Sequence, residues 1–349
     1  MSYKISIVMP VYNKEFSLMK TFNSIINQTI GFSNIELIIV DDNSTDNSKM
    51  LIKELSTQYE NINPIYLNIN SGSPGKPRNR GVKIASSDNI MFIDCGDTYS
   101  KDICEILYNS MVQKNVDLVS CGVKIYFDGI TQDAVNLVGN NKELICNPKK
   151  YDNSFKDTSM VNKIFKKKVI INNNIHCLEK GFPEDAYFII DYLFNISKAL
   201  YLNDFYGYNY IIPTSDEDTN SMSRTVDKKK ILNYILGFYK IIDLINENDN
   251  ANVLKLLSNG YMLVLISYFA KFQSSNDEKI EILNKIFDLE KYIGVSINLN
   301  QKWANMINNA ILKKKYKKAI LYSRIIFSLQ NNSFLKKIYR IKINKKSIY

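Results

Sequence analysis

Residues 68–100 read NINSGSPGKPRNRGVKIASSDNIMFIDCGDTYS and join a polar, cationic loop to an apolar strand that ends in acidic residues. The loop carries three cationic side chains, Lys76, Arg78 and Arg80, and the strand expected at residues 89–93 leads into Asp94, Cys95, Gly96 and Asp97. Lys and Arg pair with phosphate oxygens, whereas carboxylates at a strand end supply the hard oxygen ligands that Mg²⁺ or Mn²⁺ prefers. The segment indicates a site for a nucleotide diphosphate and its metal; a helix-to-strand connection with solvated charges is the alternative.

Three further apolar runs precede this segment, at residues 5–9, 37–40 and 64–67, and helical patterns alternate with them. The first run, ISIVM, is typical of a strand buried on both faces of a parallel sheet. The helix after it repeats apolar residues at helical spacing from Phe16 to Ile26. This β-α-β-α order predicts a doubly wound sheet whose ligands bind outside the carboxyl ends of the strands. Four polar side chains fall at such ends: Asn13, Asp42, Arg78 and Asp94.

The sequence also argues against several common kinds of site. No GxGxxG follows the first strand and residues 72–76 are too short for GxxxxGK[ST], which disfavours a nicotinamide dehydrogenase and a P-loop NTPase. The single histidine, His176, excludes an HExxH zinc site and argues against a Ser-His-Asp triad. The five cysteines are odd in number and lack a CxxC pair, so we expect reduced and mostly buried thiols.

The first third of the chain contains four motifs that occur together, in this order, in a known family. They are IVMPVYN at residues 7–13, LIIVDDNSTD at 37–46, PRNRG at 77–81 and MFIDCGDTY at 91–99. Together they resemble the family 2 glycosyltransferases. The resemblance implies the GT-A fold, a Rossmann-like mixed sheet flanked by helices, followed here by a mainly α-helical C-terminal domain. The segment SGSPGKPRN is most similar to enzymes that glycosylate bacterial wall polymers such as teichoic acid or capsular polysaccharide.

The resemblance also implies roles for individual residues. Those expected to border the uracil and ribose of a UDP-sugar are Pro10, Val11, Tyr12 and Asn13. Asp42 would accept a hydrogen bond from the uracil N3–H, and Lys76 and Arg78 would lie near the base or the diphosphate. Asp94 and Asp97 would face the ribose and a metal. The alternative for Asp42 is structural, because carboxylates at the start of the second helix also favour the positive end of its dipole.

The acidic motif departs from the family pattern. Relatives usually read Asp-x-Asp-Asp, whereas this chain has Gly96 at the third position, so a carboxylate that often holds the metal is missing. Cys95 is a soft ligand and a poor substitute for a hard cation. We expect Asp94 and Asp97 to hold Mn²⁺ or Mg²⁺, since such a metal on a diphosphate needs only one or two protein carboxylates beside water. The alternatives are metal-independent transfer, with Lys76 and Arg78 against the diphosphate, or an inactive relative.

A second chemical centre is expected at residues 181–185, GFPED. Pro183 suits the first turn of a helix, which places Glu184 and Asp185 at the positive end of its dipole. The resemblance implies that the Asp of this pair takes the proton of an acceptor hydroxyl as that oxygen attacks the anomeric carbon with inversion. We therefore expect Asp185 to be the general base, with Glu184 as the second candidate. The structural alternative is that both carboxylates only complement the dipole.

The remaining segments of this part carry weaker patterns. A helix is expected at residues 102–114, strands at 118–121 and 123–127, and a polar loop at 140–153. Lys166, Lys167 and Lys168 would form a solvated face. Tyr206, Tyr208 and Tyr210 alternate and would share one face of a strand. The loop at 214–224 resembles the family's mobile segment near the donor diphosphate, which makes Ser223 and Arg224 candidates for donor binding.

We expect two domains: a GT-A domain at residues 1–225, with a donor half at 1–100 and an acceptor half at 101–225, and a helical, basic domain at 226–349. After Glu290 the chain has 14 of its 45 Lys and Arg residues and none of its 35 acidic residues, so the net charge of +10 arises there. The basic segment at 311–349 would attract acidic lipid headgroups or an anionic polymer; a solvated helical face is the alternative. No nucleic-acid-binding fold accompanies it, so nucleic acid is not an expected partner.

These observations predict an inverting glycosyltransferase that moves a sugar from a UDP-sugar to a hydroxyl of a glycan or lipid-linked precursor of the bacterial surface. The N-terminal apolar run is too short for a signal sequence, and the run at 261–270 is too short to span a bilayer. We therefore expect a cytoplasmic protein that can act at the inner face of the membrane. The alternative from another class is a catalytically impaired relative, disabled by Gly96, that binds a partner or the membrane. Nucleotidyl transfer is disfavoured, because no Gly- and Lys-rich loop follows the first strand.

Overall fold

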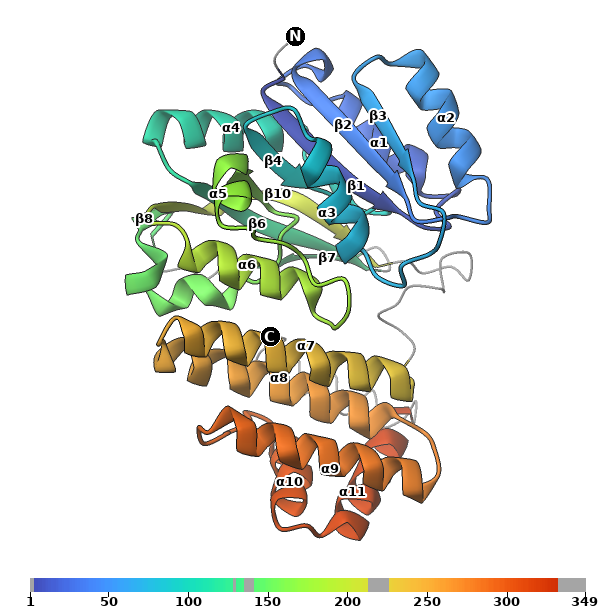
Figure 1. The fold of residues 1–349 in the computed structure, drawn as a ribbon, viewed down its shortest axis with the longest axis vertical. Helices are drawn as coiled ribbons and strands as arrows, with labels where there is room; N and C mark the ends of the chain where they lie inside the picture. Colours follow the sequence, from blue (N-terminus) through green and yellow to red (C-terminus); the bar gives the residue numbers. More distant parts are fainter. Residues whose placement is uncertain (1–2, 128–129, 135–140, 213–225, 332–349) are drawn as a thin grey trace. The chain divides into compact units, whose positions relative to one another are not determined.

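The computed structural model describes residues 3–127, 130–134, 141–212 and 226–331 (Figure 1). The chain forms two compact units, residues 1–221 and 222–349, which are described separately. The domain boundary predicted at residues 225 and 226 stays a prediction, because residues 213–225 lie outside the described part of the chain.

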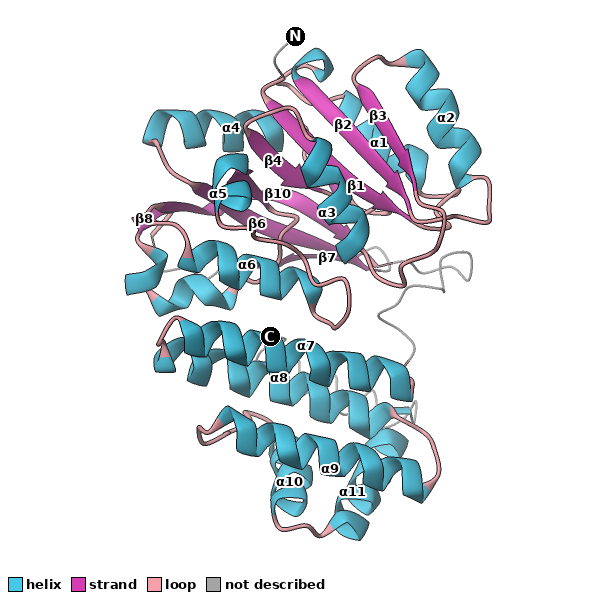
Figure 2. Cartoon of the chain, in the orientation of Figure 1, coloured by secondary structure: helices cyan, strands magenta, loops and turns pink. Residues whose placement is uncertain are grey.

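The first unit is built on one mixed sheet with the strand order β3-β2-β1-β4-β9-β6-β10-β5; β7 pairs with β6 and β8 with β10 (Figure 2). The strands are β1 Ile5–Val11, β2 Ile35–Asp41, β3 Ile62–Tyr66, β4 Asn89–Phe92, β5 Thr98–Tyr99, β6 Leu118–Phe127, β7 Ile130–Ala134, β8 Glu143–Cys146, β9 Lys163–Lys166 and β10 Ala199–Ile211. The first four strands are parallel, whereas β9 runs antiparallel to both β4 and β6. The predicted mixed sheet with flanking helices is confirmed.

Helices pack on both sides of this sheet, which explains why β1 and β2 are apolar at nearly every position. The α-helices of this unit are α1 Leu18–Ile26, α2 Ser48–Gln58, α3 Gly75–Ile84, α4 Ile103–Lys114, α5 Lys167–Asn172 and α6 Glu184–Phe194. Short 3₁₀ helices occupy Phe32–Asn34, Pro148–Lys150 and Asp152–Lys156. Helix α3 crosses β1 closely, because a Cβ at Gly81 would come within 2.3 Å of Cγ1 of Val8. Gly81 therefore sets how closely α3 can approach the sheet.

The strand order reverses between β1 and β4. From β1 the chain continues outward to β2 and β3 on one side, and β4 then pairs with β1 on the other side. Ligands of open α/β sheets bind at such a switch point, outside the carboxyl ends of the strands. The residues that follow β1 and β4 here are Tyr12 to Lys14 and Ile93 to Asp97.

Several local predictions need correction. Residues 141–153 are not a plain loop, since β8 pairs antiparallel with β10 and two 3₁₀ helices follow. Strand β8 is an edge strand with partly exposed side chains, so its composition resembles that of a loop. The two strands expected at 118–121 and 123–127 form one continuous strand, β6. In α1, Phe16 lies before the helix and is 70% exposed, and the core-facing side chains are Leu18, Phe22 and Ile25.

Two predicted surfaces also differ. Lys166 donates a 3.2 Å hydrogen bond to Oδ1 of Asn89 and Lys167 donates to the carbonyl oxygen of Ala85, so only Lys168 of that trio is exposed. Register shifts in β10 on either side of Tyr206 interrupt the expected alternation of tyrosines, and Tyr208 is buried. The cysteines agree with expectation: all five are free thiols, and four of them are buried.

The second unit is helical in its described part, as predicted. It contains α7 Lys228–Glu247, α8 Ala251–Lys271, α9 Asn276–Ile293, α10 Lys302–Leu312 and α11 Tyr316–Asn331. Within the described residues, α8 alone is long and apolar enough to cross a membrane by length and composition, which the shorter run at 261–270 did not suggest. Half of its apolar window is buried inside the protein, as in the core helix of a globular unit. Most of the basic tail, residues 332–349, lies outside the described residues.

Candidate active site

The guanidinium of Arg78 joins three elements at the carboxyl edge of the sheet. Arg78 lies on α3 and is only 3% exposed. Its Nη2 donates to Oδ1 of Asp94, which follows β4, at 2.7 Å, and its Nη1 donates to Oε1 of Glu184, the first residue of α6, at 2.8 Å. A buried, planar guanidinium that binds two carboxylates fixes both in position. The two chemical centres predicted from the sequence are therefore brought together through Arg78.

Asp185 lies beside this ion-pair cluster, in the first turn of α6. Its Oδ1 accepts a 2.8 Å hydrogen bond from the backbone N–H of Ala186. Burial raises the pKa of Asp185, and Arg78 opposes that rise. Burial and the nearby Asp185 also raise the pKa of Glu184, to about 7. A carboxylate whose pKa is raised accepts a proton more readily, so this environment suits a general base.

The carboxylate of Asp42 holds the start of the cationic loop. It accepts hydrogen bonds from the backbone N–H of Ser71 at 3.0 Å, from the Ser71 hydroxyl at 2.8 Å and from Nδ2 of Asn70 at 3.1 Å. Burial raises the pKa of Asp42, whereas the bonds from Ser71 and the charge of Lys76 lower it. Contact with uracil stays a prediction. By accepting the bonds from Ser71 and Asn70, Asp42 anchors the loop, a role that the sequence did not reveal.

The segment after β1 is tied to the segment after β2. Asn13 has a positive φ of 51°, and its Oδ1 accepts a 2.8 Å hydrogen bond from the backbone N–H of Thr45. Its own N–H donates to Oγ of Ser44 at 3.0 Å. Of the neighbouring predicted residues, Pro10 and Val11 belong to β1, whereas Tyr12 is 45% exposed. An exposed aromatic ring at this edge can stack on a flat base.

Asp97 points away from solvent toward β10. Its Oδ2 accepts a 2.6 Å hydrogen bond from the Tyr208 hydroxyl and its Oδ1 accepts a 2.8 Å bond from the N–H of Ile211. The residue is 5% exposed, and burial, together with the charge of Asp94, raises its pKa to about 7. Sequence reasoning missed Tyr208 as a partner, although its place in an alternating tyrosine run was the available signal.

The residues of the acidic motif fit a divalent cation poorly. Asp94 is bound to Arg78, although its side chain is 46% exposed, and both oxygens of Asp97 already accept hydrogen bonds. Gly96 has no side chain, and within the described residues no three His, Cys, Asp or Glu side chains gather as a metal site. A hard cation prefers several oxygen ligands in one place. The assignment of Mn²⁺ or Mg²⁺ to Asp94 and Asp97 stays a prediction.

The raised pKa of Asp97 predicts a pH dependence of stability. Between about pH 4 and pH 7 the folded protein keeps the proton on Asp97 while the unfolded chain loses it, so rising pH favours unfolding. Relative to the Asp97→Asn variant, the free energy of unfolding of the wild type should fall by about 1.4 kcal/mol per pH unit in this window. Urea unfolding of both proteins from pH 4 to pH 8 measures the difference. A constant difference across that range would contradict the prediction.

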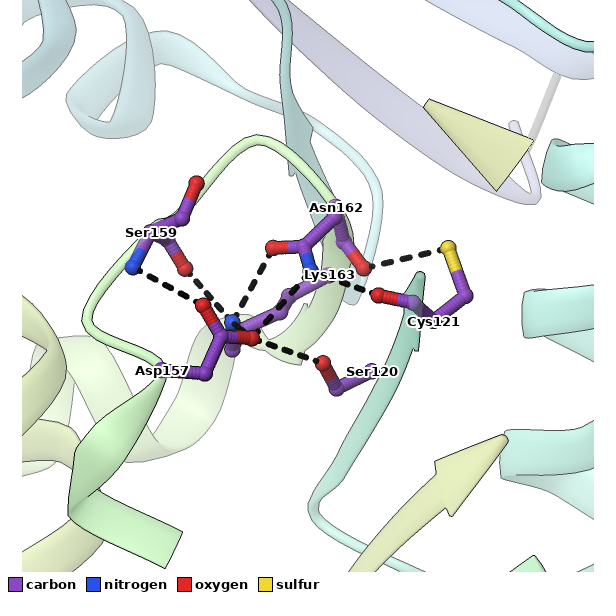
Figure 3. A network of polar contacts seen from close by, with 6 residues as sticks. All are labelled: Ser120, Cys121, Asp157, Ser159, Asn162 and Lys163. Carbon is purple, nitrogen blue, oxygen red and sulfur yellow. Dashed lines mark hydrogen bonds and ion pairs between the residues drawn. The ribbon is translucent and has the colours of Figure 1, made fainter. Parts of the chain in front are cut away.

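A separate polar network fixes the segment that precedes β9 (Figure 3). The ammonium of Lys163 is buried, forms an ion pair with Asp157 and donates to the carbonyl oxygen of Ser159 at 2.6 Å. Nδ2 of Asn162 donates to the carbonyl oxygen of Cys121 on β6 at 2.6 Å, and the Ser120 hydroxyl donates to Asp157 at 3.3 Å. The buried charge is thus fully paired and holds this segment against β6, which is a structural role.

Two of the predicted donor-binding residues, Ser223 and Arg224, lie outside the described residues. Lys14, which sequence reasoning did not single out, lies at the switch point directly after Asn13. Its position one residue beyond the PVYN motif was the available signal.

Comparisons with known proteins identify the family. The model of Glycosyl transferase family 2 matches residues 6–172. The poly(ribitol-phosphate) beta-N-acetylglucosaminyltransferase TarP of Staphylococcus aureus (strain N315) is 30% identical over 317 residues, 85% of this chain and 93% of TarP. A poly(ribitol-phosphate) beta-glucosyltransferase of Bacillus spizizenii is 30% identical over 220 residues, 61% of this chain and 33% of that protein.

A solved structure shares the fold over most of the chain. The crystal structure of S. aureus TarS 1-349 in complex with UDP-GlcNAc has a TM-score of 0.65 and 17% identity, and covers 93% of this chain and 90% of that one. The likeness establishes the GT-A fold. The alternative of an impaired binding protein has no support from these matches. The chain belongs to glycosyl transferase family 2 and is a glycosyltransferase.

Proposed function

We propose that the protein transfers a sugar from a UDP-sugar to a hydroxyl of a polyol-phosphate polymer of the teichoic acid type, with inversion at the anomeric carbon. The observation that carries the proposal is the arrangement around Arg78, which binds Asp94 on the predicted donor side and Glu184 beside the candidate base Asp185. The name of the relative TarP, a poly(ribitol-phosphate) beta-N-acetylglucosaminyltransferase, supports the acceptor and donor classes.

The chemistry needs one base on the acceptor side. In a single displacement the acceptor oxygen attacks the anomeric carbon, and its proton must pass to a nearby group. Asp185 is our candidate for that base, because its pKa is raised by burial and a backbone hydrogen bond holds one of its oxygens. Glu184 is engaged by Arg78 and serves in this proposal as a positioning residue.

The donor would lie across the ends of the first four strands. Tyr12 offers an exposed ring for the uracil, and Asp42 and the loop that it anchors border the same edge. Lys76 lies close enough to Asp42 to act on its charge, so it is available on the nucleotide side. Pro10, Val11 and Asn13 complete the wall of the predicted base and ribose site.

The binding of a divalent metal at Asp94 and Asp97 is also a prediction. Enzymes of this family generally use a divalent metal. Asp94 would be the more accessible ligand for Mn²⁺ or Mg²⁺, and Asp97 would need to exchange its bonds with Tyr208 and Ile211.

The acceptor and the place of action follow the same reasoning. A polymer or lipid-linked acceptor would be met at the cytoplasmic face of the membrane, and the basic segment at 311–349 would attract either anionic polymer or anionic lipid.

We propose residues 1–225 as the catalytic domain and 226–349 as the helical domain. Mass spectrometry of products from a panel of UDP-sugars with poly(ribitol phosphate) would identify the sugar.

Donor binding is directly testable. UDP should bind the purified chain in calorimetry, and Asp42→Ala and Asp94→Asn should weaken binding by about tenfold or more, as expected for the loss of a hydrogen bond to a charged group. Asp88→Ala, which removes an exposed carboxylate away from this edge, is the matched control and should bind like the wild type. Absence of UDP binding to the wild type, with and without Mn²⁺, would refute the proposed function.

A further inference from the structure

The loop that leads into α6, residues 173–183, is attached to α3 by the side chain of Asn79. Its Oδ1 accepts a 2.8 Å hydrogen bond from the backbone N–H of Cys177, and its Nδ2 donates a 2.9 Å bond to the carbonyl oxygen of the same residue. Nδ2 also donates a longer bond, of 3.4 Å, to Oε1 of Glu179. A side-chain amide that pairs with both backbone groups of one residue fixes its position and its orientation.

The same loop packs directly on the first turn of α3. A Cβ at Gly75, the first residue of α3, would come within 2.1 Å of the carbonyl oxygen of Leu178, so the contact needs a glycine on the helix. Cys177 and Leu178 are both buried. A polar contact at Asn79 and a steric contact at Gly75 thus set the path of the loop over α3.

This path decides where the first turn of α6 lies. The loop runs directly into Glu184 and Asp185, and Arg78, the neighbour of Asn79 on α3, binds the side chain of Glu184. Arg78 restrains that one side chain, whereas the backbone that carries Asp185 depends on the loop before it. A general base must lie within hydrogen-bond reach of the acceptor hydroxyl, and a displacement of about 1 Å can cost about 10²-fold in rate.

We propose that Asn79 is a positioning residue for sugar transfer: by fixing Cys177 it holds the first turn of α6 so that Asp185 reaches the acceptor hydroxyl. The inference rests on the proposed function. Asn79 takes no proton in this role and acts through Asp185. Helix α3 would then serve both sides of the reaction, since Arg78 binds Asp94 on the donor side and Asn79 holds the loop on the acceptor side.

Turnover and UDP binding separate this role from damage to the donor site. Asn79→Ala should lower kcat by about 10–100-fold, because Asp185 is displaced, and should leave the UDP affinity within about threefold of the wild type. Asn79→Asp keeps the side-chain volume but cannot donate to the Cys177 carbonyl, so it should also lower kcat; it supplies the test if Asn79→Ala does not fold. A wild-type kcat in either variant would overturn the role of Asn79, while transfer by the wild type would still support the proposed function.

Asn61 offers a matched control with the same kind of contact. Its Nδ2 donates to the carbonyl oxygens of Phe32 at 2.9 Å and Ile35 at 2.7 Å, at the amino end of β2 and away from the carboxyl edge of the sheet. Asn61→Ala should therefore keep kcat within about twofold of the wild type, as expected for a distant, independent site. A loss of kcat as large as that of Asn79→Ala would show that turnover responds to any weakened loop, and would overturn the inference.

A double-mutant cycle tests whether Asn79 acts through Asp185. In Asp185→Asn the base is absent, so its position no longer matters, and adding Asn79→Ala should lower kcat by less than about twofold further. Asn79→Ala alone should keep the acidic limb of the wild-type pH profile, because Asp185 still takes the proton. An equal fold-loss of kcat in both backgrounds would overturn the inference. A wild type that neither binds UDP nor transfers sugar would refute the proposed function and this inference together.

Discussion

Asp185→Asn is expected to lower the rate of sugar transfer by about 10²–10⁴-fold, the usual contribution of a positioned general base. Asparagine has nearly the same shape as aspartate and can still accept the N–H of Ala186, but it cannot take a proton from the acceptor hydroxyl. Binding of UDP should change little, because Asp185 belongs to the proposed acceptor side. Turnover with a polymer acceptor and calorimetry with UDP measure the two effects independently.

The control for this variant lies on the same helix. Asp191→Asn removes a carboxylate near the other end of α6, where Oδ1 accepts a 2.9 Å bond from Nδ2 of Asn195, and should preserve turnover. The pH profile gives a second readout, since the wild type should lose activity as acid protonates the base, and the low residual rate of Asp185→Asn should lack that acidic limb. Unchanged turnover in Asp185→Asn would show that Asp185 is not the general base, and Glu184 would then be the candidate.

Arg78→Met is expected to destabilise the first unit by about 3–5 kcal/mol, as found when one partner of a buried ion pair is removed. The reason is that Glu184 would keep a buried carboxylate without its guanidinium, and Asp94 would lose its tether to α3. Arg78→Lys should recover only part of this loss, because a single ammonium cannot bind both carboxylates with the same fork geometry. Urea unfolding measures the change in stability. Hydrogen exchange in peptides of β1 and β4 assigns that change to the first unit.

Two comparisons isolate the ion-pair effect from a general loss of packing. Arg80→Met changes an exposed residue of the same helix and should stay within about 0.5 kcal/mol of the wild type. Adding Glu184→Gln to Arg78→Met should restore part of the lost stability, because the unpaired buried charge is then removed. A double variant that is less stable by the sum of both single effects would show that Arg78 acts through packing alone.

Much of the fold was readable from local patterns. The apolar runs of β1 and β2 predict buried parallel strands, and the residues after those strands mark the ligand edge before any contact is known. Strand β8 was missed because an edge strand with half-exposed side chains is held by backbone hydrogen bonds, which leave little trace in composition. The alternation of tyrosines in β10 failed for a similar reason, since the register shifts beside Tyr206 depend on the partner strand.

The sequence by itself determined the family, the order of strands and helices, and the chemical types that gather at one edge: cations after Pro74, carboxylates after β4 and at the start of α6. Only the tertiary structure decided which of them meet. Arg78 pairs with Glu184 across 106 residues, and Asp97 accepts a hydrogen bond from Tyr208 across 111 residues. Local spacing encodes helix and strand periods, whereas contacts between distant side chains depend on strand order and register.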